Sequence, residues 1–103
     1  MQSHYDASFV REMGCTVSEW MGWLPAAIGE HPWTLQGEGA HVALDRLQAG
    51  ASLDVRWQVL SPRLIALARI PRLEVSFTLH GLDAAQRYTF MKRFDLYMQR
   101  GGG

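Results

Sequence analysis

Cysteine and lysine are almost absent from the chain. Cys15 is the only cysteine among 103 residues, so no disulfide can form within the chain. A lone thiol suits a reducing compartment, and we expect a cytoplasmic location. Lys92 is the only lysine, and arginine supplies the rest of the positive charge.

Long apolar runs and common catalytic signatures are also missing. Without a run of about 18 apolar residues we expect no membrane-spanning helix, and the first residues lack the pattern of a signal peptide. The sequence has no glycine-rich nucleotide loop, paired-cysteine zinc motif or serine-hydrolase elbow. The histidines are not spaced to share a metal on one helix or strand: His4, His31, His41 and His80. We therefore expect no metal and no cofactor, and we favour a non-catalytic domain over an enzyme of unrecognised type.

The net charge is zero, but it is divided unevenly along the chain. Residues 1–50 carry two basic and six acidic side chains, a balance of −4, whereas residues 51–103 carry eight and four, a balance of +4. The simplest interpretation is that the two halves pack together and neutralise each other. Arginines cluster near aromatic residues around position 69, as on a surface for single-stranded nucleic acid. The neutral overall charge and the scarcity of lysine argue against a nucleic-acid partner.

Two helices and a strand stand out. Apolar and polar residues alternate from Leu73 to His80, which predicts a strand with one buried face. Asp83 is a suitable N-cap for an amphipathic helix over about 84–99. Thr16 and Glu19 have the spacing of a capping box and open an earlier helix. We expect Pro25 to kink that helix, or the helix to end near Leu24 with one more turn after it.

Five further segments are predicted to be strands: 5–13, 33–36, 41–47, 53–59 and 63–69. Tight turns are expected at Ser61-Pro62 and Ile70-Pro71. The segment 63–69 is apolar on both sides, as in a central strand covered on both faces or a strand at a partner interface.

The order strand, helix, five strands, helix predicts an α+β fold. We expect two layers, with an antiparallel sheet of about six strands and both helices, including the long C-terminal one, on one face. This order resembles the helix-grip and TATA-binding-protein-like architectures, in which a curved antiparallel sheet wraps a long C-terminal helix. Residues 1–100 should form one domain, followed by a glycine tail over 101–103.

The favoured function is protein interaction, most simply homodimerisation through the sheet. The expected interface residues are Arg63, Ile65, Leu67 and Arg69. The alternative is a small apolar ligand held between the sheet and the C-terminal helix. The expected ligand-binding residues are Trp57, Phe77, Phe90 and Phe94 as an aromatic wall, with Arg87 and Asp95 as polar groups. Asp95 has a second interpretation, because a carboxylate at the edge of an apolar face also suits an ion pair or a hydrogen bond to the sheet.

Overall fold

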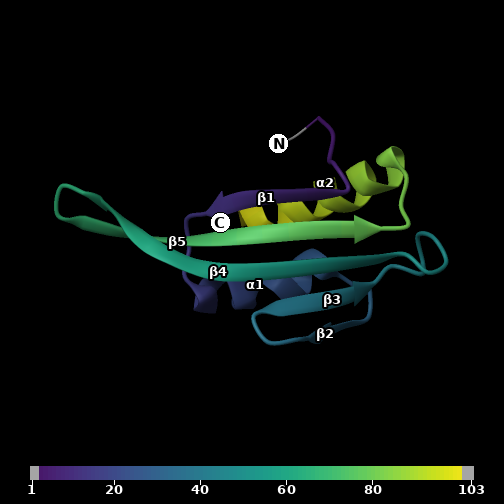
Figure 1. Cartoon of the computed structure of the whole chain (residues 1–103), viewed down its shortest axis with the longest axis horizontal. Coiled ribbons are helices and arrows are strands. Elements are labelled where there is room, and N and C mark those ends of the chain that lie inside the picture. Colours follow the sequence, from purple (N-terminus) through teal and green to yellow (C-terminus); the bar gives the residue numbers. More distant parts are fainter. Residues whose placement is uncertain (1–2, 101–103) are drawn as a thin grey trace.

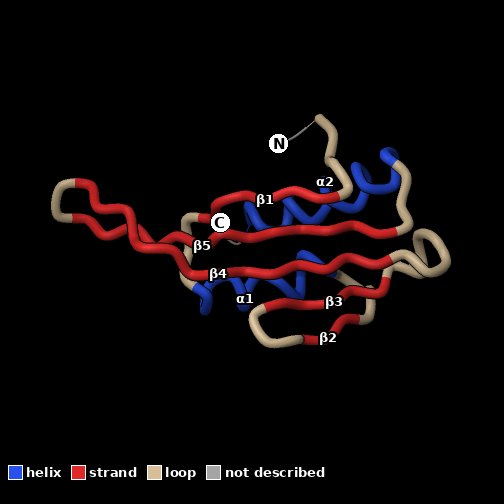
Figure 2. The backbone as a smooth tube through the Cα atoms, in the orientation of Figure 1, coloured by secondary structure: helices blue, strands red, loops and turns tan. Residues whose placement is uncertain are grey.

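A computed structural model describes residues 3–100 of the chain (Figures 1 and 2). Five strands and two helices follow one another as β1 (Ser8–Met13), α1 (Val17–Ile28), β2 (Trp33–Leu35), β3 (Gly39–Ala43), β4 (Ser52–Ile65), β5 (Ala68–His80) and α2 (Ala84–Arg100). The strands form one antiparallel sheet in the spatial order β1-β5-β4-β3-β2. Both helices lie on the same face of the sheet (Figure 1), which gives a two-layer α+β arrangement.

One core fills the space between the helices and the sheet. Alternate residues of β5 are buried there, as the period of two predicts. They join buried side chains of both helices, among them Trp20 and Leu24 of α1 and Phe90, Phe94 and Met98 of α2. Within residues 3–100 no helix lies on the opposite face of the sheet, and we call it the open face.

Both predicted helix starts are confirmed. The backbone N–H of Glu19 donates to the Thr16 hydroxyl at 3.1 Å, and the Glu19 carboxylate accepts from the Thr16 N–H at 3.0 Å. Asp83 and Gln86 make the same reciprocal pair at the start of α2. The helix α1 does not end at Leu24, because it continues through Pro25 to Ile28.

The sheet has five strands in the described part of the chain, not the six that the sequence predicts. The segments 53–59 and 63–69 were expected to be separate strands. The first lies within β4, whereas 63–69 contains the end of β4, the turn at 66–67 and the start of β5. The expected turn at Ser61-Pro62 lies within β4, and the expected turn at Ile70-Pro71 lies within β5. The segment 63–69 is therefore not a central strand but the end of a hairpin.

A β-bulge explains how the two prolines fit into strands. The register of β4 on β5 passes from the pair Leu60–Arg72 to the pair Arg63–Ile70, so two residues of β4 lie opposite Pro71 alone. Proline has no N–H to give to a ladder, and bulges are places where a strand accepts it. The pattern that indicates a turn in the sequence thus marks a bulge in the structure.

The outer part of the β4–β5 hairpin extends beyond the rest of the sheet, and we call residues 61–71 the arm. β1 ends opposite Leu73 of β5, and β3 begins opposite Arg56 of β4, so no third strand continues along the arm. Figures 1 and 2 show it extending past both helices, and the molecule is 49 Å long but only 29 and 22 Å across. The resemblance to the helix-grip and TATA-binding-protein-like architectures is not confirmed by this sheet. The glycine tail over 101–103 lies outside the described residues.

Neither α1 nor α2 combines the length and the apolar character that a membrane crossing requires.

Candidate functional site

The four aromatic residues predicted to line a ligand cleft are brought together between α2 and the sheet. Trp57, Phe77, Phe90 and Phe94 are all buried. The ring of Phe94 lies 5.6 Å from that of Phe77, edge to face, and 6.1 Å from that of Phe90. Trp20 of α1 lies between Phe94 and Trp57, at 6.4 and 5.8 Å from their rings. These rings contact one another, so they supply core packing energy in this layer.

The two polar residues predicted for the same cleft have partners within the protein. Arg87 donates from Nε to the Tyr5 carbonyl and from Nη1 to the Leu82 carbonyl, both at 2.9 Å. Asp95 accepts from the Tyr5 hydroxyl at 2.5 Å and from Arg11 Nη1 at 2.7 Å. Burial, together with the hydrogen bond to Asp95, raises the pKa of the Tyr5 phenol well above its usual range. These contacts tie α2 to the start of the chain.

Arg11 lies on the mostly apolar face of β1 and Asp95 on that of α2, and the fold brings these two charged side chains into contact. The Arg11 guanidinium also lies over the rings of Phe9 and Phe77, at 5.3 and 5.0 Å from their centroids. A buried carboxylate is costly unless it is paired and hydrogen-bonded, and Asp95 is both. The contacts match the ion-pair interpretation of Asp95 and give the ligand-cleft hypothesis no support.

The four residues predicted for an interface all lie on the arm, where apolar side chains are exposed to an unusual degree. Leu67 is 102% exposed at the hairpin tip, Leu64 is 68% exposed and Ile65 is 54% exposed. Arg63 pairs across the hairpin with Ile70, and Arg69 pairs with Leu64. Exposed apolar groups gathered on one projecting element are typical of an interaction surface.

A hollow lies at the base of the arm. It has a volume of about 260 Å³ and is lined by Glu12, Gly14, Arg63, Ile65, Ile70 and Arg72. Cross-strand partners share a face, so Arg63 and Ile70 lie on one face of the arm, with Ile65 and Ala68 beside them. We call this the hollow face of the arm. At the base of the arm the hollow is completed by Glu12, Gly14 and Arg72, which the sequence did not indicate as part of an interface.

Ion pairs fix the direction of the arm relative to the sheet. Arg72 donates to the Glu12 carboxylate of β1 at 2.8 Å and to the Ser61 carbonyl at 2.8 Å. Arg63 lies 3.5 Å from the same Glu12 carboxylate. The bulge and the two prolines make the arm edges poor templates for another strand, because they interrupt the row of backbone donors. A partner would therefore bind the side chains of the arm rather than its edge.

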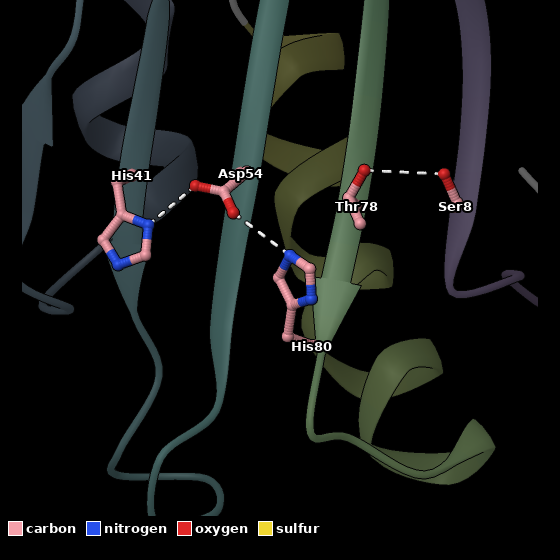
Figure 3. Close-up of polar contacts among 5 residues, drawn as sticks. All are labelled: Ser8, His41, Asp54, Thr78 and His80. Atoms are coloured by element: carbon pink, nitrogen blue, oxygen red, sulfur yellow. Dashed lines mark hydrogen bonds and ion pairs between the residues drawn. The ribbon is translucent and has the colours of Figure 1, made fainter.

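A second polar cluster lies on the open face of the sheet, at the end away from the arm (Figure 3). Asp54 of β4 contacts His41 Nδ1 of β3 through one oxygen at 2.7 Å, and His80 Nε2 of β5 through the other at 3.1 Å. The hydrogen bond from His41 is the main reason that the pKa of Asp54 lies below its usual value. Farther along the same row, the Ser8 and Thr78 hydroxyls lie 3.5 Å apart.

The cluster leaves one imidazole nitrogen of His41 available to other molecules. With Nδ1 of His41 bonded to Asp54, Nε2 can form a hydrogen bond with solvent or with a bound molecule. The two rings approach different carboxylate oxygens (Figure 3), and no three metal-binding groups among residues 3–100 converge on one point. The side chains of all three residues are more than two-fifths exposed, so the cluster is not enclosed in the way that proton-transfer sites usually are.

No pattern in the sequence indicates this cluster directly, because its members come from three strands. A hairpin centred on the turn expected near residue 49 would place His41 opposite Trp57. In the structure the connection between β3 and β4 spans 44–51, so His41 lies opposite Asp54. The contact with His80 likewise depends on the register across the long β4–β5 hairpin.

No family model, curated protein or solved structure matches this chain.

Proposed function

We propose that the protein is a non-catalytic interaction domain that forms a homodimer through the β4–β5 arm. The observation that carries the proposal is the exposure of Leu67 and Ile65 on a hairpin that extends past both helices. Burying these side chains against a second molecule would be favourable by roughly 25 cal/mol for each Å² removed from water. A cytoplasmic location is part of the proposal, because the single thiol, that of Cys15, is free and buried.

A second copy of the chain is the partner that suits this surface. A two-fold axis can place the hollow face of one arm against the same face of the other, so Ile65, Ala68 and Ile70 of both copies lie in the contact. The charges at the base of the arm do not oppose such a contact strongly, because Arg63 and Arg72 already pair with Glu12. Interfaces combine an apolar centre with a polar rim in this way.

The test compares Ile65→Glu with Val10→Glu. Val10 is 61% exposed on the open face of β1, away from the arm, so it receives the same change at similar exposure. We expect the wild type and V10E to sediment as dimers and I65E as a folded monomer of 11.6 kDa. Sedimentation velocity over a concentration series measures this, with circular dichroism to establish folding.

Two results would contradict the proposal. A wild type that remains a monomer at the highest concentrations would remove the dimer altogether. An I65E variant that stays as dimeric as V10E would show that the dimer forms through another surface.

A further inference from the structure

We infer that, in this dimer, Leu67 at the tip of each arm occupies the hollow at the base of the other arm. The inference rests on the proposed function and specifies its geometry. Three observations support it: the conformation of the tip, the shape of the hollow and the position of both on one hairpin.

The tip of the arm does not contain the residues that tight turns usually have. Ala66 has a φ of 53°, in the left-handed region that favours glycine, asparagine or aspartate. Next to it, Leu67 is fully exposed. A turn selected for folding alone would carry glycine and a polar residue here. Backbone strain next to an exposed leucine is therefore consistent with a leucine that contacts a second molecule.

The hollow has the size and the lining to receive one aliphatic side chain. Its volume of about 260 Å³ lies below the range of pockets for drug-sized ligands. Ile65 and Ile70 supply apolar walls. Gly14 leaves one side open, since a Cβ added there would meet nothing within 4 Å. The ion pairs of Glu12 with Arg63 and Arg72 form a polar rim around this apolar surface.

The symmetry of a dimer brings the tip and the hollow together. The hollow lies on the same face of the arm as Ile65, and the part of it lined by Glu12, Gly14 and Arg72 lies at the end of the arm opposite the tip. When two arms lie antiparallel with these faces together, the tip of each reaches the base of the other, and the contact occurs twice.

Filling the hollow tests the inference without changing the tip. Gly14→Phe places a large side chain in the open space, and Gly22→Phe is the matched control on the exposed side of α1, where an added Cβ also meets nothing. Neither glycine has a positive φ, so both variants should fold. We expect G14F to raise the dimer dissociation constant about 10-fold or more and G22F to leave it within about 2-fold of wild type.

Disulfide trapping provides a second measurement that does not depend on the phenylalanine variants. A mixture of a Leu67→Cys chain and a Gly14→Cys chain should give a crosslinked heterodimer under mild oxidation, seen by mass spectrometry without reductant. The L67C chain alone should not crosslink, because the two tips lie at opposite ends of the paired arms.

Failure of the inference can be told apart from failure of the proposed function. A wild type that never dimerises overturns both. If I65E dissociates the dimer but G14F does not, or if L67C crosslinks to itself, the arms still form the interface. In either case Leu67 does not occupy the hollow.

Discussion

The base and the arm of the β4–β5 hairpin consist of the same two strands, yet they differ in almost every physical respect. In the base, β1 and β3 flank the hairpin and both helices cover one of its faces. In the arm, the two strands have only each other. Phe77 in the base is completely buried, whereas Leu67 at the tip is completely exposed.

This difference shows that apolar content alone does not make a strand part of a core. Leu64, Ile65 and Ile70 are as apolar as the buried residues of the base, but no layer is placed to cover them. A two-stranded hairpin is at best marginally stable in water. We therefore attribute the stability of the domain to the base, and its capacity for association to the arm.

The largest effect should come from truncating matched apolar side chains in the two regions. Phe77→Ala should lower the free energy of unfolding by about 3–5 kcal/mol, because it opens a cavity in a packed core. Leu67→Ala should change it by less than about 0.5 kcal/mol, since the side chain has no contacts to lose in the monomer. Urea unfolding of both variants in the monomeric I65E background measures the difference. A large loss for L67A in that background would mean that the tip contributes to the fold.

A second comparison sets the ion pair of the core against the ion pairs of the arm. Asp95→Ala removes the carboxylate that accepts from Arg11 and Tyr5 and should cost about 3 kcal/mol, as expected when one member of a buried pair is removed. Glu12→Gln breaks exposed contacts with Arg63 and Arg72 and should cost at most about 1 kcal/mol. Urea unfolding of the two variants measures both losses in the free energy of unfolding. Equal losses would show that the pairs at the arm base are as important to the fold as the buried one.

The base was largely predictable from the sequence, and the arm was not. Alternation from Leu73 to His80, the capping box at Thr16 and the N-cap at Asp83 report local geometry, so a single sequence reveals them. Ser61-Pro62 and Ile70-Pro71 have equally strong local patterns, but these patterns are ambiguous. Proline fits both a turn and a bulge, and the choice depends on the register between β4 and β5.

The residues of the candidate sites were likewise predictable only where a local pattern in the sequence indicates them. Arg63, Ile65, Leu67 and Arg69 were proposed as an interface because their segment is apolar on both sides, and the structure places all four on the arm. Whether they form an interface stays a prediction. Gly14 and Glu12 could not be added to that set, since only the pairing of β1 with β5 brings them to the base of the arm. The contact between Asp95 and Arg11 likewise joins positions far apart in the chain.

The smallest effect should come from the polar cluster on the open face of the base. The His41 hydrogen bond keeps the pKa of Asp54 lower in the folded chain than in the unfolded one, so the contact stabilises the fold above the unfolded pKa, near 4. Asp54→Asn should therefore cost at most about 1 kcal/mol at pH 7, because the group is well exposed. The difference from wild type should shrink as the pH falls below about 4.

Urea unfolding at pH 7 and pH 3 measures this difference, with Ser8→Ala as a control on the same face that removes no charge. Asp54 lies at the end of the base away from the arm, so D54N should leave the dimer dissociation constant unchanged. A D54N variant that dissociates the dimer would mean that the interface reaches across the open face, and the separation between a folding base and an associating arm would no longer hold.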